Sequence, residues 1–369
     1  METVAIRFPH ERTLMEIRKL NRAARTGRRL KLAGTALIAA AVLFSTAACG
    51  GNAGGSGNSP EVSIMVGGLN KVIYLPAKLT EQLGYFKDEG LNVTLLEEQS
   101  GANSTNAVLA GQVNGAVGFY DHTIMVQPKG QCIQSVVQFA NIPGEAEVIS
   151  TKNAAAYQSM KDLEGKNLGM TSFGSSTDFL TQALAGQAGV QNYTPVKVGA
   201  GPTFIAQLQQ GSIDAGMTTD PTIAQLESSG EGKVLVEMRT ADGTKAALGG
   251  LYPASSLYMS CDYVQKNPET VQKLANALVK TLRYINANDA ATIAAKMPAD
   301  YAAAGKELYE KSVNDSKGIF NQDGKMDPEG AKNVLRILDT YAADLKGKGG
   351  SIDMSKTYTT QFVDKVPAG

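Results

Sequence analysis

The chain contains the same short pattern twice along its length. Leu109–Ala116 and Leu208–Ala215 each read as the end of a helix, a glycine turn and the start of a short apolar strand. The first copy leads to the corner 121–124 (DHTI) and the second to 220–223 (DPTI), so each strand is followed by a polar corner that opens a helix. Such a corner presents free backbone N–H groups. The repeat predicts two α/β lobes facing each other across a ligand site, and chance similarity of two βα units is the alternative.

Beyond residue 60 the chain alternates between short apolar runs and helical stretches. This alternation is the pattern of an α/β protein with mostly parallel sheets. The predicted strands cover residues 62–66, 92–96, 115–119, 133–139, 167–171, 196–198, 213–218, 233–237 and 256–260. At 369 residues the chain is longer than one hydrophobic core usually supports, which also favours two lobes.

The repeat also predicts how the chain is divided. We expect lobe 1 at residues 60–145 and lobe 2 at residues 146–248, with residues 249–369 returning to lobe 1. The helices of this last part have no counterpart in the repeat and are expected to pack on lobe 1. Two crossings between the lobes make a hinge, and closure of a hinge around a ligand is a common switching mode.

Residues 1–48 look like a targeting segment rather than part of the fold. A basic stretch precedes the 17-residue apolar run Leu32–Ala48, which ends at Cys49 and a Gly/Ser-rich linker spanning 49–59. These features are typical of a secretory signal peptide. Small residues directly before Cys49 resemble a bacterial lipobox and predict its lipidation. A retained membrane anchor is the alternative, since 17 apolar residues can span a bilayer. Both interpretations place the folded part outside the cytoplasmic membrane.

The charge balance argues against a nucleic-acid partner. Residues 1–48 carry nine of the 35 basic and three of the 35 acidic side chains, so the remainder has 26 basic and 32 acidic groups, a net charge of −6. Phosphate binding needs clustered positive charge. We therefore expect no nucleic-acid partner, and we expect a monomer.

Two cysteines follow Cys49. Cys132 precedes the last strand before the first crossing, and Cys261 follows the strand made after the return. If those strands are antiparallel neighbours, the start of one meets the end of the other, and a disulfide would suit an extracytoplasmic protein. Two separate buried thiols are the alternative.

Candidate ligand-binding residues lie at the corners that follow the strands. In open α/β sheets, ligands bind beyond the carboxyl ends of the strands. Small hydroxyl residues at helix starts suit such a site, although each of them is also a common helix cap. The candidates are Asn70, Lys71, Ser100, Asn103, Tyr120, Asp121, His122, Ser172, Ser175, Ser176, Thr218 and Asp220.

Tyr120, Asp121 and His122 form the most individual of these corners. We expect Tyr120 to stack on a planar ligand and Asp121 to accept a hydrogen bond from a ring N–H or an amine. His122 is the only histidine beyond the targeting segment, so no His-rich metal site is expected. The sequence contains no H-E-x-x-H, G-x-S-x-G or P-loop pattern. The expectation is a protein that is not an enzyme and needs no metal or cofactor.

One longer segment resembles a known protein family. It runs from Ile73-Tyr74-Leu75-Pro76-Ala77 to Gly84-Tyr85-Phe86-Lys87, followed by Gly90-Leu91-Asn92-Val93. This pattern is similar to the solute-binding proteins of ABC importers in the nitrate/sulfonate/taurine/bicarbonate group, which also includes binders of thiamine-pyrimidine precursors. The motifs at 110–114 and 211–214 also look like those of this family.

The resemblance implies a two-lobed, type II periplasmic-binding-protein fold with a hinge. It implies an extracytoplasmic lipoprotein that captures a small solute and delivers it to an ABC permease and its ATPase, anchored to the membrane through its lipid. A sensor lipoprotein without a transport role is one alternative. A relative of the fungal pyrimidine-precursor synthases is another, although the Cys-rich motif of those enzymes is absent here.

The resemblance leaves the solute open between two classes. Sulfonate and nitrate binders use hydroxyls, amides and helix N-termini, which the corners 100–104 and 172–177 can supply. Pyrimidine binders use aromatic rings and a carboxylate, which Tyr120, Asp121 and Glu145 can supply. A free carboxylate repels an anion, so Asp121 and Asp220 count against nitrate or sulfonate unless both act as caps.

Overall fold

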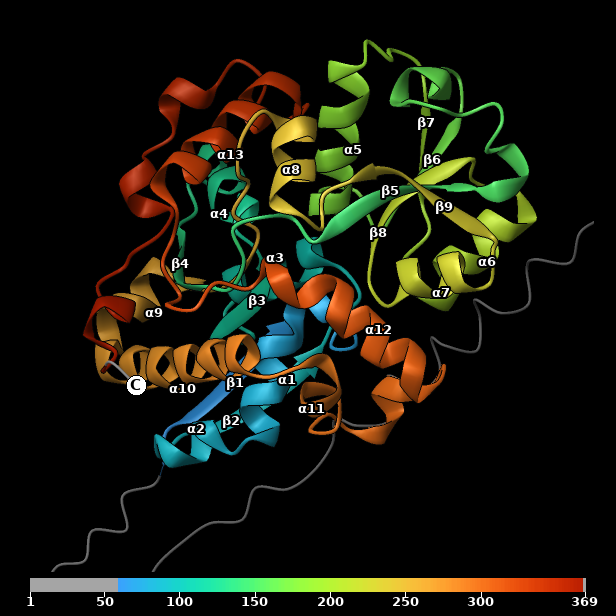
Figure 1. Cartoon of the computed structure of the whole chain (residues 1–369). Coiled ribbons are helices and arrows are strands. Elements are labelled where there is room, and N and C mark those ends of the chain that lie inside the picture. The colour runs from blue at the N-terminus through green and yellow to red at the C-terminus, as the bar shows by residue number, and fades with distance from the viewer. Residues whose placement is uncertain (1–58, 368–369) are drawn as a thin grey trace, which may run out of the picture. The chain divides into compact units, whose positions relative to one another are not determined.

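The computed structural model describes residues 59–367, which form two lobes with one five-stranded sheet each (Figure 1). The first sheet has the order β2-β1-β3-β10-β4 and the second has the order β7-β6-β8-β5-β9. The first sheet consists of β1 (Glu61–Val66), β2 (Asn92–Glu97), β3 (Gly115–Phe119), β4 (Ile133–Gln138) and β10 (Ser255–Ser260). The second consists of β5 (Glu145–Ser150), β6 (Asn167–Met170), β7 (Thr194–Lys197), β8 (Ala215–Thr219) and β9 (Gly232–Glu237). The predicted signal segment and Cys49 lie outside the described residues.

In each sheet one strand runs against the others. β10 is antiparallel to β3 and β4, and β5 is antiparallel to β8 and β9, whereas the other pairs are parallel. Both reversed strands are the first that the chain forms after it crosses from the other lobe. The prediction of two α/β lobes with mostly parallel sheets is confirmed.

The two crossings lie side by side and pair with each other. The backbone N–H of Tyr252 donates to the carbonyl of Asn141 at 3.1 Å, and that of Ala254 donates to the carbonyl of Ala140 at 2.9 Å. These hydrogen bonds join the segment that leaves the first lobe to the segment that returns to it. They form the short hinge between the sheets.

Strand β5 was not among the predicted strands. Glu145 and Glu147 alternate with apolar residues in it, and such alternation usually marks a strand with one face in water. The structure instead buries all six residues. Its burial depends on the second sheet and the crossings that surround it, which the local sequence does not report.

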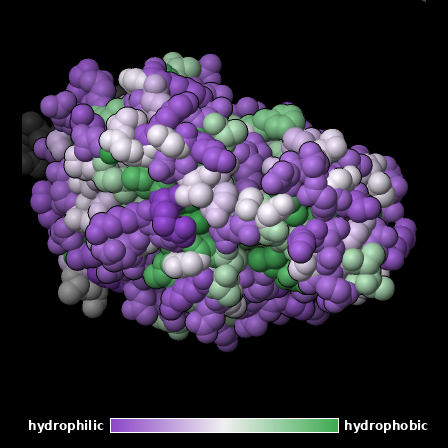
Figure 2. All heavy atoms as spheres, turned by 90° about the horizontal axis from the view of Figure 1, so that it is seen from above, coloured by the Kyte–Doolittle hydropathy of each residue, from purple (hydrophilic) through white to green (hydrophobic). Residues whose placement is uncertain are grey.

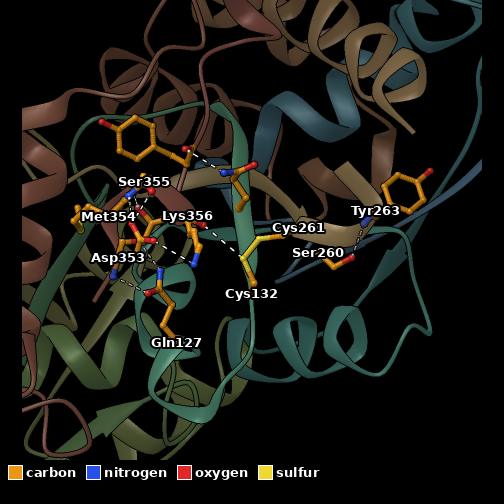
Figure 3. The surroundings of a disulfide bond; sticks show 12 residues. Gln127, Cys132, Ser260, Cys261, Tyr263, Asp353, Met354, Ser355 and Lys356 are labelled. Carbon is orange, nitrogen blue, oxygen red and sulfur yellow. Dashed lines mark hydrogen bonds and ion pairs between the residues drawn. A yellow bond between two sulfur atoms is a disulfide. The ribbon is translucent and has the colours of Figure 1, made fainter. Parts of the chain in front are cut away.

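A disulfide joins Cys132 and Cys261 at the far end of the first sheet, with a Cα–Cα distance of 5.5 Å (Figure 3). The bond follows from the register, because Ile133 at the start of β4 pairs with Ser260 at the end of β10. Beside it, Gln127 and Asp353 exchange two hydrogen bonds of 2.9 Å, which hold the C-terminal segment against this end of the lobe.

The C-terminal helices contact both lobes, which differs from the expectation that they pack on lobe 1. One that fits it is α10 (Pro268–Ala287), which packs on α1 (Leu75–Gln82) and α2 (Tyr85–Asp88). By contrast, α12 (Lys306–Ser316) contacts α7 (Thr222–Ser228) of the second lobe as well as residues 72–74 of the first. Likewise α13 (Pro328–Tyr341) packs on α5 (Ser176–Gln187) and on α4 (Asp121–Met125). The repeat could not predict this, because it does not extend to these helices.

The surface offers little apolar area. In Figure 2 the visible face is mainly hydrophilic, with apolar residues in small separate patches. Among residues 59–367 the exposed large hydrophobic side chains are Leu96 and Phe173, and Phe173 is 59% exposed. Within the same range, no helix combines the length and the apolar character needed to cross a membrane.

Candidate functional site

The two lobes touch directly at the corners that the sequence analysis singled out. The hydroxyl of Ser100, which caps α3 (Gly101–Leu109), lies 2.7 Å from the hydroxyl of Ser172 in the second lobe. Nearby, the backbone N–H of Val72 in the first lobe donates to the carbonyl of Asp220 in the second at 3.0 Å. The structure therefore has its lobes in contact, and side chains from both lobes and the hinge enclose one polar region.

Three glycines let side-chain rings lie directly against the backbone of the first lobe. A Cβ at Gly67 would lie 3.3 Å from Tyr74, one at Gly101 would lie 2.5 Å from Nε2 of His122, and one at Gly118 would lie 2.7 Å from the hydroxyl of Tyr258. Contacts this short require glycine at Gly101 and Gly118 unless the facing ring moves. These glycines therefore help to position the rings that line the polar region.

We call this region the interlobe cluster, and it consists of Lys71, Tyr74, Asp121, His122, Glu145 and Tyr252. All of its members are buried. Tyr252, from the returning segment of the hinge, donates its hydroxyl hydrogen to Oδ2 of Asp121 at 3.1 Å. Nδ1 of His122 lies 3.3 Å from Oδ1 of Asp121, although these two atoms are not aligned as a hydrogen bond. Glu145 enters from β5, at the start of the second lobe.

Burial shifts the ionisation of every charged member of the cluster. It raises the pKa of Asp121 to about 7, opposed by the hydrogen bond from Tyr252, and lowers the pKa of His122 to about 4. It also lowers the pKa of Lys71 to about 8, although the carboxylate of Glu145 opposes that shift. Burial raises the pKa of Glu145 well above its usual value, although the positive charge of the Lys71 ammonium acts to lower it. Groups that titrate near neutrality inside a closed site are typical of functional sites.

The cluster holds buried polar side-chain atoms that have no partner among the described residues. Among the described residues, Oδ1 of Asp121, Nε2 of His122 and Oε2 of Glu145 are buried without a hydrogen-bond partner. The one ammonium group is already engaged, because Nζ of Lys71 donates to the carbonyl of Gly67 at 2.8 Å and approaches that of Gln99 at 3.5 Å. Buried polar atoms are normally satisfied, so these atoms indicate a site for a bound molecule, and the two carboxyl oxygens suit one that brings donors.

Two cavities border the cluster. The Lys71 cavity has a volume of about 720 Å³ and lies between Asn70 and Lys71 of the first lobe, the loop 197–203 of the second, and Tyr301. The His122 cavity, of about 310 Å³, lies between His122 and α3 on one side and Phe173 and Phe179 on the other. Both have residues of the two lobes in their walls, and both volumes are in the range of small-molecule sites.

The structure brings some of the predicted site residues together. Lys71, Asp121 and His122 belong to the interlobe cluster, Ser100 and Ser172 form the lobe contact, and Asn70 lines the Lys71 cavity. Ser175 and Ser176 lie at the start of α5 and are buried. The hydroxyl of Ser175 is used within the loop, where it donates to the carbonyl of Ser172 at 2.6 Å.

Four predicted residues do not face the cluster. The hydroxyl of Tyr120 lies 2.7 Å from that of Thr357, so this ring packs against the C-terminal segment. The expectation that it stacks on a planar ligand is therefore wrong. The side chain of Asn103 is exposed and bonds to Glu98. Thr218 pairs with Ala146 on β5, which places it on the opposite face of the sheet from Glu145. The carboxylate of Asp220 is fully used by Ala224, Arg239 and Ser316.

Tyr74 and Tyr252 were missed by the sequence analysis. Tyr74 lies inside the family motif, where it reads as part of a helix start, and Tyr252 lies in an irregular crossing segment. Neither position has a local signal for a site, because both become site residues only through the hinge and the lobe contact. Glu145 was considered as a carboxylate for a pyrimidine, and its strand places it in the cluster.

Comparison with protein families gives one match that covers most of the structure. The family described as NMT1/THI5 like matches residues 74–291 of this chain. This range includes β2 to β10 and all of the interlobe cluster except Lys71.

Curated relatives all share one kind of name. A 4-amino-5-hydroxymethyl-2-methylpyrimidine phosphate synthase of Aspergillus parasiticus is 26% identical over 305 residues, covering 79% of this chain and 83% of that protein. A synthase of the same name from Saccharomyces cerevisiae is 27% identical over 225 residues, covering 58% of this chain and 64% of that protein. The alignment thus spans less than two thirds of the yeast protein.

Solved structures share the fold. A protein of Bordetella bronchiseptica RB50 has a TM-score of 0.79 and 31% identity, covering 84% of this chain and 97% of that chain. The alkanesulfonate-binding protein of Xanthomonas axonopodis pv. citri has a TM-score of 0.65 and 17% identity, covering 83% of this chain and 100% of that chain. The ligand-binding component of an ABC-type import system from Staphylococcus aureus has a TM-score of 0.66 and 12% identity, covering 84% and 100%. These likenesses confirm the periplasmic-binding-protein fold and the resemblance seen in the sequence.

The curated names contradict the expectation that the protein is not an enzyme. That expectation was based on missing hydrolase, P-loop and metalloprotease motifs and on the missing Cys-rich motif. The relatives named as synthases match 79% and 58% of this chain despite these absences. A missing motif is therefore no guide to catalysis in this group.

Proposed function

This chain belongs to the NMT1/THI5-like family, and we propose that it is an extracytoplasmic lipoprotein that captures a pyrimidine-type solute between its lobes and delivers it to an ABC import permease. The solute would bind at the interlobe cluster when the lobes are apart and be enclosed when they meet. Anchoring through Cys49 would keep the protein beside the permease.

The observation that carries this proposal is the excess of buried acceptors in the interlobe cluster. An aminopyrimidine offers an exocyclic amine to carboxylates and a flat ring to tyrosines. Sulfonate, nitrate and bicarbonate need donors, whereas Asp121 and Glu145 present oxygen atoms without partners among the described residues. The cluster thus supports the pyrimidine class over the anions.

The lobe contact supports capture by closure. A ligand shifts a conformational equilibrium only by its difference in affinity between the two states. The cluster draws residues from the first lobe, the second lobe and the hinge, so a solute in it has all of its contacts only in the closed form.

A thermal-shift screen tests the solute class. The full chain is heated with aminopyrimidines, alkanesulfonates, nitrate, bicarbonate and aromatic carboxylates in turn. We expect aminopyrimidines to raise the melting temperature, because a ligand at 100 times its Kd stabilises the folded state by about 2.7 kcal/mol. Stabilisation by an anion and by no pyrimidine would refute the proposed class. Uptake of the stabilising solute by cells with and without this protein then separates import from sensing.

A second candidate function is chemistry on a pyrimidine in the same cluster. The synthase names of the curated relatives favour it, and the pKa values of Asp121 near 7 and Lys71 near 8 suit proton transfer at neutral pH. Incubation of the full chain with the stabilising solute, followed by mass spectrometry, tests it. A product that forms with the native chain but not with Asp121→Asn would favour catalysis, whereas unchanged solute would leave binding as the function.

A further inference from the structure

We propose, building on the proposed function, that the solute is an organic cation, held by Asp121 and Glu145 and surrounded by the tyrosines of the interlobe cluster. The protein would then discriminate by charge and not only by shape. A neutral pyrimidine would be a weaker ligand than a protonated or quaternised one of the same size.

The first step of the argument is the charge balance of the cluster. Asp121, Glu145 and the ammonium of Lys71 are the charged groups of the cluster apart from His122, which stays uncharged because burial lowers its pKa to about 4. The next acid on the same face of β5 is Glu147, which is fully buried and has neither oxygen paired within residues 59–367. Acids therefore outnumber cations, and because unpaired buried charges are costly, burial raises the pKa of all three acids. A cationic solute supplies the missing positive charge.

The second step is the position of Lys71. Its ammonium is turned toward the backbone carbonyls of Gly67 and Gln99, 2.8 and 3.5 Å away, and makes no hydrogen bond to Glu145. Oε2 of Glu145 and Oδ1 of Asp121 are left without partners in the described part of the chain. The two carboxylates thus stay available to a solute although a lysine is close.

The third step is the aromatic surroundings. Tyr74 and Tyr252 are buried in the cluster, and Tyr252 already contacts Asp121. The face of Tyr74 receives a cation in the structure, because Nζ of Lys71 lies 6.0 Å from its ring centre. Aromatic rings attract cations most strongly when both are removed from water. Carboxylates next to buried rings are a combination that favours organic cations over metal ions, and the described residues contain no cluster of metal ligands.

A matched pair of ligands tests the inference on the full chain. 4-Aminopyrimidine is uncharged at pH 7.5, and its N1-methyl derivative is a permanent cation of nearly the same shape. We expect titration calorimetry to give an affinity at least about tenfold higher for the cation, the factor that about 1.4 kcal/mol of added attraction supplies. Equal or tighter binding of the neutral compound overturns the cation inference and leaves the proposed function intact. Failure of both compounds, and of every other pyrimidine in the screen, overturns both.

Charge-removing variants separate the role of charge from that of shape. Asp121→Asn and Glu145→Gln keep the size of each side chain. Each is expected to lower the affinity for the cation more than the affinity for the neutral compound. Asp262→Asn is the control, because Asp262 is exposed on α9 (Cys261–Lys266) and should change neither affinity. If either cluster variant fails to fold, the other carries the test. Equal losses for both compounds would mean that the carboxylates act only as acceptors, which would refute the inference.

Discussion

The hydroxyl oxygens of Ser100 and Ser172 lie 2.7 Å apart although the two residues belong to different lobes. Ser100 caps α3, and Ser172 lies in the loop that leads to α5, so this one hydrogen bond joins the starts of two facing helices. The corners predicted to converge on a ligand therefore also contact each other. Lobe contact and solute binding share the same residues.

We expect Ser172→Ala to weaken closure without unfolding either lobe. A hydrogen bond contributes about 0.5–1.5 kcal/mol, which corresponds to a two- to tenfold loss of solute affinity if the bond forms only in the closed state. Calorimetry with the solute found by thermal shift measures this loss. Ser229→Ala is the control, because that hydroxyl bonds only within the second lobe. An unchanged affinity for Ser172→Ala would show that the contact does not help to hold the lobes together.

Asp220 is expected to matter for stability. Its carboxylate accepts hydrogen bonds from Ser316 at 2.7 Å, Arg239 at 3.2 Å and the backbone of Ala224 at 3.0 Å, and it is fully buried. Breaking a buried charge pair costs about 3–5 kcal/mol. We expect Asp220→Ala to lower the free energy of unfolding by about 3 kcal/mol. This is the lower end of that range, because Arg239 keeps its bonds to Glu237.

Urea unfolding followed by circular dichroism measures the effect of Asp220→Ala. Asp262→Ala serves as the comparison, because it removes an ion pair whose two side chains are both 68% exposed and which should contribute little. Similar stabilities for the two variants would contradict the structural role of Asp220.

The stability of the protein should fall as the pH rises from 6.5 to 8. Burial raises the pKa of Glu147 to about 8 from an ordinary value of 4.5, so in this range the folded state holds a proton that the unfolded state has lost. Each pH unit then lowers the free energy of unfolding by about 1.4 kcal/mol for this one group. Glu145 acts in the same direction, as does Asp121 up to its pKa of about 7. Lys71 begins to oppose the fall as the pH approaches its pKa of about 8, and His122 opposes only at lower pH.

Glu147→Gln should remove the share of this pH dependence that belongs to Glu147, about 1.4 kcal/mol per pH unit, and leave the shares of Glu145 and Asp121. Urea titrations at pH 6.5, 7.25 and 8 compare its slope with that of the native chain and of Glu269→Gln, a variant at an exposed position on α10. A slope in Glu147→Gln as steep as that of the native chain would show that Glu147 is not the group responsible.

Loss of the disulfide should destabilise the whole described region. Cys132 and Cys261 are separated by 129 residues, a span that contains the entire second sheet. Cross-linking a loop of this size stabilises the folded state by about 5 kcal/mol on the chain-entropy estimate. We expect the double variant Cys132→Ala, Cys261→Ala to unfold at a lower urea concentration. Adding a reductant should affect the native chain and not this variant; equal effects on both would contradict the bond.

Local sequence was enough to predict the elements that depend on local chemistry. Gly84 is one example, since a glycine there readily adopts the φ of 76° that ends α1 and lets Phe86 turn into the core. The pairing of β4 with β10 was predicted only as a condition for a disulfide, and the structure provides both the pairing and the bond between Cys132 and Cys261. By contrast, β5 was not predicted, and the full burial of its two glutamates depends on the segments packed around it.

The sequence by itself determined the two α/β lobes, their parallel strands and the corners where a ligand can meet backbone N–H groups. Those features follow from apolar periodicity, turns and caps, which act over a few residues. Only the tertiary structure decided that Asp121 and Glu145 meet across the hinge with Tyr74 and Tyr252, while Tyr120 and Asp220 turn to other partners. The reason is physical, because burial and charge pairing at the cluster come from segments far apart in the chain, and no single segment carries the information about its distant neighbours.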